Sequence, residues 1–178
     1  MSRDELTFFS FTVLVLVGRG GAGAHDLLRM AKRGRIYDWA GESQYYTEPK
    51  RLARLGYLEA RQEPGKTRAR TVYTLTEKGL GALSEWARTP LGFPRLRHDP
   101  SLRVLAADLV GVETLLGSFD SLRADIADLA ARLDIAESAA AALPHRETAL
   151  LLNHRLARRL LGVHLEWLDE VERELGQD

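Results

Sequence analysis

The chain has 178 residues, of which 45% are hydrophobic, so it can bury the core of one domain or of two small ones. It has no cysteine, which excludes disulfide scaffolds and thiolate metal sites and favours a reducing, cytoplasmic location. The net charge is zero, but residues 1–90 carry 15 Lys and Arg against 10 Asp and Glu, whereas residues 91–178 carry 10 against 15. This asymmetry predicts a basic binding module joined to an acidic module with another role; two ordinary solvated surfaces are the alternative.

The first element is an apolar run at residues 8–17, which is interrupted by Ser10 and Thr12. The run is too short to span a bilayer, so we expect no membrane segment here. A signal peptide is the weaker alternative, because Asp4 and Glu5 precede the run and no cysteines follow it. Periodicity alone leaves open whether the run is a buried helix or a buried strand.

A glycine-rich turn follows, in which Gly18, Gly20 and Gly23 form the sequence G-x-G-x-x-G, with Asp38 further along. This is the pattern of a dinucleotide-binding turn, where backbone N–H groups hold a pyrophosphate. That site needs a second parallel strand after the next helix, and residues 35–46 are not a buried apolar strand. We therefore expect a flexible turn between two helices, with an α/β nucleotide-binding protein as the alternative.

Two helices are predicted next. Residues 24–33 have the periodicity of a short amphipathic helix, which Gly34 can end. Residues 43–55 predict a second helix with a basic face, but Pro49 conflicts with a regular helix interior. Either this helix starts near Thr47, which places the proline in its first turn, or it is kinked; the sequence does not decide between the two.

A β-hairpin is predicted after the second helix. Residues 57–60 and 71–75 are strand-like, and Pro64-Gly65 between them is a strong turn signal. A helix followed by a hairpin with a basic tip is the layout of a winged helix, which places cations in the DNA major groove and at the flanking phosphates. A solvated basic surface is the alternative for either cluster alone. We predict that phosphates are contacted by Lys50, Arg51, Arg54, Lys66, Arg68 and Arg70, and base edges by Ser43, Gln44, Tyr45 and Tyr46.

The chain then changes character. Residues 76–87 predict a helix in which Trp86 is a core anchor, and the proline-rich segment at residues 91–100 predicts a linker. We therefore expect a winged-helix DNA-binding domain at residues 1–90 and a helical dimerisation domain at residues 101–178.

The helical half carries more apolar surface than one neighbouring helix can cover. From Ser101 onward apolar residues step by 3 and 4, which is typical of a coiled-coil-like seam, until Pro144 ends the pattern. The last helix, at about residues 146–175, has two apolar stripes. We predict homodimerisation through this half, with an intramolecular bundle or an unrelated protein partner as alternatives. The expected interface consists of Phe119, Leu122, Ile126, Leu129, Leu133, Leu152, Leu156, Leu160, Val163 and Trp167.

The sequence resembles PadR-family transcription regulators. The resemblance covers the first 90 residues through AHDLL, YYTEPKRLARLGYLEA and RTVYTLTEKGLGALSEW, and the helical half through SLRVLAADL and LEWLDEV. The family usually has Leu where Pro49 stands, and His-Gly-Tyr where this chain has His25, Asp26 and Leu27. The resemblance implies a mainly α fold, a winged helix-turn-helix with a two-stranded β-wing and a C-terminal helical dimerisation domain. It also implies a homodimeric repressor that binds double-stranded DNA. A small aromatic effector, bound near the dimer interface, would release the repressor from the DNA.

No enzymatic activity is predicted. The five histidines are scattered without the i, i+4 spacing of a helical metal site, and neither a G-x-S-x-G nor a Walker sequence is present. We therefore expect no catalytic residue, no metal site and no cofactor.

Overall fold

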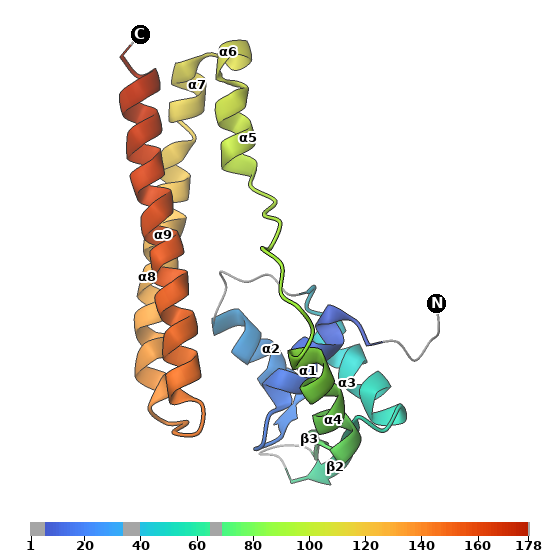
Figure 1. The fold of residues 1–178 in the computed structure, drawn as a ribbon. Coiled ribbons are helices and arrows are strands. Elements are labelled where there is room, and N and C mark those ends of the chain that lie inside the picture. Colours follow the sequence, from blue (N-terminus) through green and yellow to red (C-terminus); the bar gives the residue numbers. More distant parts are fainter. Residues whose placement is uncertain (1–5, 34–39, 65–68, 178) are drawn as a thin grey trace. The chain divides into compact units, whose positions relative to one another are not determined.

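The structure, a computed structural model, describes residues 6–33, 40–64 and 69–177 (Figure 1). The chain divides into two compact units, Met1–Gly92 and Phe93–Asp178. In the part of the chain that is described, no helix combines the length and the apolar content that crossing a membrane requires. Each unit is built around its own apolar contacts, so the two are described separately.

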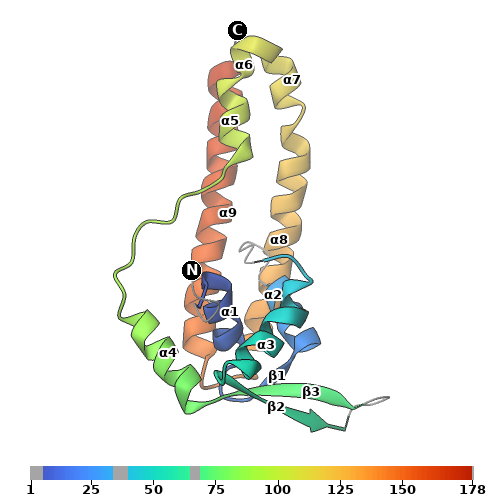
Figure 2. The same cartoon turned by 90° about the vertical axis from the view of Figure 1, so that its right-hand side faces the viewer.

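The N-terminal unit combines helices with a small antiparallel sheet in the strand order β1-β3-β2. Strands β2 and β3 form the predicted hairpin, paired from Leu58↔Leu75 to Glu63↔Arg70, and they project as a ribbon beyond the helices of this unit (Figure 2). The elements are α1 (Phe8–Val17), β1 (Ala22–Gly23), α2 (Ala24–Arg33), α3 (Gln44–Arg54), β2 (Leu58–Glu63), β3 (Arg70–Leu75) and α4 (Glu77–Ala87).

The apolar run at residues 8–17 is a helix, α1, which resolves the choice that periodicity left open. A capping box starts it, because the Ser10 amide donates to Thr7 Oγ1 at 3.2 Å and the Thr7 amide donates to Ser10 Oγ at 2.9 Å. Gly18, with φ of +55°, ends it. The cap therefore selects helix over strand for a segment whose apolar residues alone fit both.

The glycine-rich turn does more than connect two helices. It leads into β1, in which Ala22 pairs with Tyr73 and Gly23 with Val72, antiparallel to β3. Gly21 has φ of +71°, and a Cβ added there would lie 2.9 Å from the Tyr73 carbonyl oxygen. The expected plain turn therefore missed a strand. The nucleotide-binding alternative is wrong, because its glycine turn must follow a β-strand and the segment before Gly18 is helix α1.

Helix α3 contains its proline in the interior. Turn hydrogen bonds from the amides of Gln44 and Tyr45 to the carbonyls of Gly41 and Glu42 start the helix at Gln44, so the alternative start near Thr47 is wrong. Pro49 is buried and lacks the N–H that an interior residue donates.

A Schellman motif ends α3. The Gly56 amide donates to the Ala53 carbonyl and the Tyr57 amide to the Leu52 carbonyl, both at 3.0 Å, and Gly56 has φ of +79°. The chain therefore reverses directly from α3 into the hairpin.

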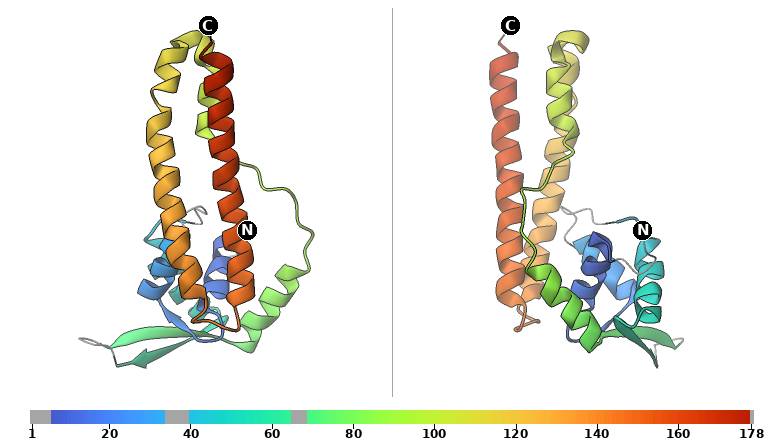
Figure 3. Two further views of the ribbon diagram at one scale, coloured as in Figure 1. Left: turned by 90° about the vertical axis from the view of Figure 1, so that its left-hand side faces the viewer. Right: turned by 45° about the vertical axis from the view of Figure 1, so that its right-hand side comes forward.

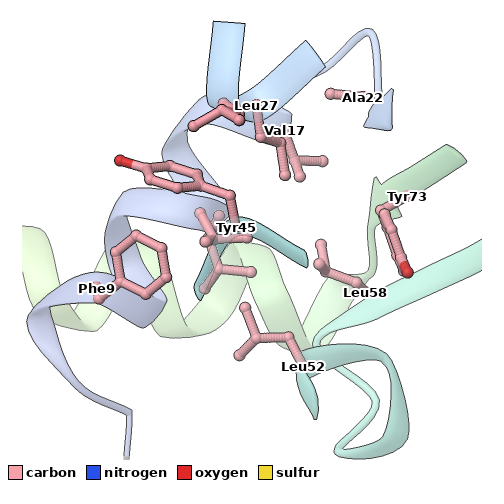
Figure 4. Packing of buried hydrophobic residues seen from close by; sticks show 11 residues of the cluster. Phe9, Val17, Ala22, Leu27, Tyr45, Leu52, Leu58 and Tyr73 are labelled. Atoms are coloured by element: carbon pink, nitrogen blue, oxygen red, sulfur yellow. The ribbon is translucent and has the colours of Figure 1, made fainter. Parts of the chain in front are cut away.

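One apolar cluster holds this unit together (Figure 4). Leu52 of α3 and Leu27 of α2 are fully buried beside Leu14 of α1. Burial of each such leucine contributes about 1.5–3 kcal/mol. The side of α3 that faces this cluster is therefore the side that cannot face a ligand.

The C-terminal unit is helical throughout its regular elements. The long helices α8 and α9 run side by side (Figure 3), and three short helices precede them. The apolar pattern expected from Ser101, which resumes after Gly117, is also broken at Ala106 and Gly111, and Gly111 has φ of +87°. The elements are α5 (Asp99–Leu105), α6 (Ala107–Val110), α7 (Val112–Leu116), α8 (Phe119–Ala140) and α9 (Glu147–Leu175).

Helices α8 and α9 bury one apolar face between them. Their buried residues are Phe119, Ile126, Leu133, Ala136 and Ala140 on α8, and Ala157, Leu161, Leu168 and Val171 on α9. Arg123 bridges the helices to Asp169 at 2.7 Å and to Glu172 at 2.8 Å, and Arg158 binds Asp134 at 2.8 Å. The pair therefore has a core of its own, flanked by ion pairs.

Candidate nucleic-acid interface

The candidate site is the outward face of α3 together with the β2–β3 hairpin. Ser43, Tyr46, Thr47, Lys50 and Arg54 are exposed. Their spacing places them on one side of the helix, opposite Leu52 and Pro49, which are buried. This face offers two cations, two hydroxyl groups and a phenol on a helix of 11 residues. Such a combination can bind phosphates and hydrogen-bond to base edges.

Tyr45 was predicted at base edges, and that prediction is wrong. The side chain is 2% exposed, and its ring packs edge-on against Phe9 with centroids 4.9 Å apart (Figure 4). Packing of α3 on α1 sets this rotation, because the Phe9 ring and the Ser10 hydroxyl both contact the side of α3 that carries Tyr45 and Glu48.

Thr47 is the residue that sequence analysis missed. Its hydroxyl lies one turn after Ser43 and one turn before Lys50, on the exposed face. The i, i+3 spacing from Gln44 and to Lys50 was a signal that could have found it. Gln44 itself is exposed at the edge of the same face.

Arg51 is not a freely exposed cation. Its guanidinium donates to Glu48 from Nε at 2.9 Å and from Nη2 at 2.8 Å, and Nη2 also reaches Ser10 Oγ at 3.0 Å. Ser10, fully buried in α1, donates to Glu48 Oε1 at 2.7 Å. These three side chains join α3 to α1, so Arg51 helps to hold the helix in place, and its phosphate contact stays a prediction.

The charge of Glu48 depends on this cluster. Burial alone would raise the pKa of Glu48, but the hydrogen bonds from Arg51 and Ser10, with the Arg51 charge, lower it below its usual value. The carboxylate is therefore ionised across the neutral pH range. It presents a fixed partner to Arg51 on the inner side of α3.

The hairpin supplies further cations. Arg70, at the start of β3, is exposed and pairs with Asp26 at 3.2 Å and Glu63 at 3.5 Å. Arg61 of β2, which sequence analysis did not select, is exposed and pairs with Glu59 at 2.9 Å. Lys66 and Arg68, predicted at the tip, lie outside the described residues. The described cations of the hairpin are thus oriented by neighbouring carboxylates.

The residues predicted for a dimer interface separate into two groups. Phe119, Ile126 and Leu133 are buried in this chain, where α9 packs against α8, so they are not available to a partner. The prediction is wrong for these three because one stripe of α9 already covers them. Leu122, Leu129, Leu160 and Trp167 are partly buried. Leu152, Leu156 and Val163 are 56%, 50% and 58% exposed.

The C-terminal unit contains a cavity of about 370 Å³ between the beginnings of α5 and α8. Phe119, Leu122 and Pro100 supply its apolar lining. The Arg103 guanidinium, 2.7 Å from Asp99, stands at the same site with Ser121. This lining combines an aromatic ring and hydroxyl groups with one cation and two carboxylates, Asp99 and Asp125, which suits a small amphipathic molecule.

Solved structures of transcription regulators share this fold along nearly the whole chain. Bacillus subtilis PadR in complex with operator DNA aligns with a TM-score of 0.82 at 18% identity, covering 96% of this chain and 99% of that chain. The same protein in complex with p-coumaric acid aligns with a TM-score of 0.73 at 18% identity, covering 100% and 99%. The Vibrio cholerae virulence activator AphA aligns with a TM-score of 0.72 at 24% identity, covering 96% and 98%.

No protein-family model and no curated protein matches the sequence. The structural likeness nevertheless confirms the fold that the resemblance implied: mainly helical, with a winged helix and a C-terminal helical region.

Proposed function

We propose that this chain is a homodimeric, sequence-specific DNA-binding transcription regulator. The observation that carries the proposal is the exposed face of α3, where the hydroxyl groups of Ser43 and Thr47 are followed by the cations Lys50 and Arg54. The buried side of the same helix is held by Leu52 and by the Ser10–Glu48–Arg51 cluster. A structurally similar protein, Bacillus subtilis PadR, has been solved with operator DNA. We assign Lys50 and Arg54 to phosphates, and Ser43, Gln44, Tyr46 and Thr47 to base edges.

A DNA selection from a random duplex library tests this assignment. A homodimer is expected to bind a pseudo-palindromic sequence whose half-site centres lie about 10 bp apart, or a multiple of about 10 bp apart. We expect the Lys50→Ala and Arg54→Ala variants to bind the selected duplex more weakly than wild type. Each substitution removes one phosphate contact per protomer, so the slope of log affinity against log salt should fall by about 2. Fluorescence anisotropy over a salt series measures both quantities.

Matched variants distinguish the loss of a DNA contact from the mere loss of a positive charge. Arg132→Ala removes a cation from α8, where it is paired with Asp128, and should leave both affinity and salt slope unchanged. Arg51→Ala should lower DNA affinity together with the stability of the N-terminal unit, because it leaves Glu48 without its partner. Wild-type affinity and slope in both the Lys50 and Arg54 variants would remove α3 from the proposed interface.

The regulator is further proposed to be a repressor released by a small aromatic effector. The cavity beside Phe119 and Arg103 supports this, since it joins an aromatic wall to a cation. Bacillus subtilis PadR, which has a similar fold, has been solved with p-coumaric acid. Hydroxylated aromatic acids are therefore the first class of compound to try.

Thermal unfolding with a panel of such acids tests the effector site. A compound present at 100 times its dissociation constant stabilises the folded state by about 2.7 kcal/mol, which is readily seen as a higher unfolding temperature. Ser121→Tyr fills the cavity and should abolish the increase, whereas Ser138→Tyr, on the same helix but outside the cavity, should retain it. Equal increases in both variants would exclude this cavity as the binding site.

A further inference from the structure

Two histidines that are distant in sequence meet in the C-terminal unit. His98 is the N-cap of α5, and its Nε2 lies 2.9 Å from Nε2 of His164 on α9. The other nitrogen of each ring is also engaged. His98 Nδ1 accepts from the Ser101 amide at 3.2 Å, and His164 Nδ1 lies 2.6 Å from the Leu160 carbonyl oxygen.

These partners determine where the protons are. A carbonyl only accepts, so His164 carries its proton on Nδ1 and leaves Nε2 as an acceptor. An amide N–H only donates, so His98 accepts at Nδ1 and carries its proton on Nε2. The hydrogen bond between the rings therefore runs from His98 Nε2–H to His164 Nε2. A bridging metal ion would need both Nε2 atoms deprotonated, which the Ser101 amide disfavours.

Every nitrogen of the pair is used in this neutral state, so an added proton must displace a contact. A proton on His164 Nε2 would face the N–H of His98, unless His98 moved its own proton to Nδ1. That shift would place two donors, His98 Nδ1–H and the Ser101 amide, against each other and remove the helix cap. Protonation of both rings would break the contact between them as well.

The surroundings favour the neutral pair. Burial, and then the neighbouring His164, lower the pKa of His98, while Asp99 opposes the shift. Among the described residues, these two are the titratable groups whose charge acts on His98, and Asp99 is itself bonded to Arg103 at 2.7 Å. The indole of Trp167, 5.6 Å from the His98 ring between centroids, adds an uncharged wall.

We propose that His98 and His164 form a proton-sensitive latch, which fastens the start of α5 to α9 while both rings are neutral and opens when they are protonated. Residues 90–97, immediately before the latch, have no regular structure and are exposed. Opening would free the first turn of α5 and so lengthen the tether to the N-terminal unit. A consequence for DNA binding, lower operator affinity at acidic pH, rests on the proposed function; the latch itself does not.

The direction of the pH effect follows from the lowered pKa of His98. The unfolded chain takes up the proton at about pH 6.5, before the folded chain does. The stability that the latch contributes is therefore complete above that pH and is lost as the pH falls below it.

NMR titration of the full-length chain tests the latch directly. We expect the His98 ring to titrate below the usual histidine value of about pH 6.5, and the Ser101 amide signal to shift at the same pH as the ring. In His164→Gln, whose amide oxygen can still accept from His98, burial still lowers the pKa of His98, but its titration midpoint should rise because the His164 charge is gone. A His98 midpoint at or above about pH 6.5, or an unchanged midpoint in His164→Gln, would overturn the latch.

Thermal unfolding gives an independent reading. His98→Asn keeps a side-chain acceptor for the Ser101 amide but removes the imidazole pair. Between pH 7.5 and 5.5, wild type should lose about 2 °C more in unfolding temperature than His98→Asn does, whereas His145→Gln should behave as wild type. Equal losses in wild type and His98→Asn would contradict the proposal.

Operator binding at the same two pH values separates the consequence from the latch. A pH-dependent affinity in wild type that is absent in His98→Asn supports regulation by the latch. Equal pH dependence in the two proteins overturns the link to DNA while the titration result stands. If the protein binds no selected duplex at either pH, the proposed function is overturned. The latch is then judged by the titration alone.

Discussion

Replacing Leu152 and Leu156 with glutamate is expected to convert the protein into a folded monomer with much weaker operator binding. Both leucines lie on the stripe of α9 that α8 does not cover, and each is at least half exposed. In a dimer formed through this stripe, each substitution would bury a carboxylate in an apolar surface, which costs several kcal/mol. The opposite stripe, which includes Leu161 and Leu168, keeps the chain's own helix pair intact.

The expected loss of operator affinity is about 100-fold or more. Two linked half-sites bind far more tightly than one, because the second contact becomes intramolecular once the first is made. Sedimentation velocity should show a single monomeric species, circular dichroism should show unchanged helix content, and anisotropy should show the loss of affinity.

A matched variant on the same helix controls for the added charge. Arg155→Glu places a carboxylate outside the stripe, at an exposed position, and should leave both the dimer and operator affinity in place. A double glutamate variant that still sediments as a dimer would show that the two subunits meet elsewhere. A monomer that binds the operator as tightly as wild type would instead contradict the proposed need for two half-sites.

Gly79→Ala is expected to destabilise the N-terminal unit by about 3 kcal/mol. This is the upper end of the destabilisation that an extra methyl group causes in a well-packed site. Gly79 lies in the first turn of α4, and a Cβ there would stand 2.3 Å from the Tyr57 carbonyl oxygen. That carbonyl cannot withdraw freely, because it accepts from the Thr76 amide at 3.2 Å and from the Thr76 hydroxyl at 3.1 Å. The contact joins α4 to the residue that opens the hairpin, so we also expect weaker DNA binding.

Gly81→Ala provides the control within the same helix. A Cβ at Gly81 would meet no atom within 4 Å, so alanine there should stabilise the helix by up to about 1 kcal/mol. Urea unfolding of the two variants should therefore give changes of opposite sign. Similar midpoints for Gly79→Ala and wild type would show that α4 does not pack against Tyr57 as described.

Much of the N-terminal unit was predictable because its signals are local. The bounds of α2 were expected as observed, since apolar spacing and charged ends act within one or two turns. The hairpin also followed from a short pattern, Pro64-Gly65 between two strand-like runs. Charge asymmetry between the two halves pointed to two modules, and the resemblance to PadR-family regulators supplied the fold as a whole.

Other features depend on which distant segments come together. Strand β1 has two residues and no strand-forming sequence; it exists because β3 lies beside it. Tyr45 was expected outside and Thr47 was overlooked, because the rotation of α3 is set by its packing on Phe9 and Ser10 of α1. The sequence alone also could not show that Arg51 contacts Glu48 and Ser10. A basic residue on a helix can bind either a neighbouring carboxylate or a phosphate.

The C-terminal helical half shows most clearly which features could not be predicted from the sequence. The spacing of apolar residues shows that α9 carries two stripes, which is more apolar surface than one neighbouring helix can cover. Only the tertiary structure decided that Leu161 and Leu168 face α8 while Leu152 and Leu156 stay exposed, because both stripes are apolar and only the register of α8 against α9 distinguishes them. The same packing brought His98 to His164, across 66 residues, and no local pattern in the sequence encodes that contact.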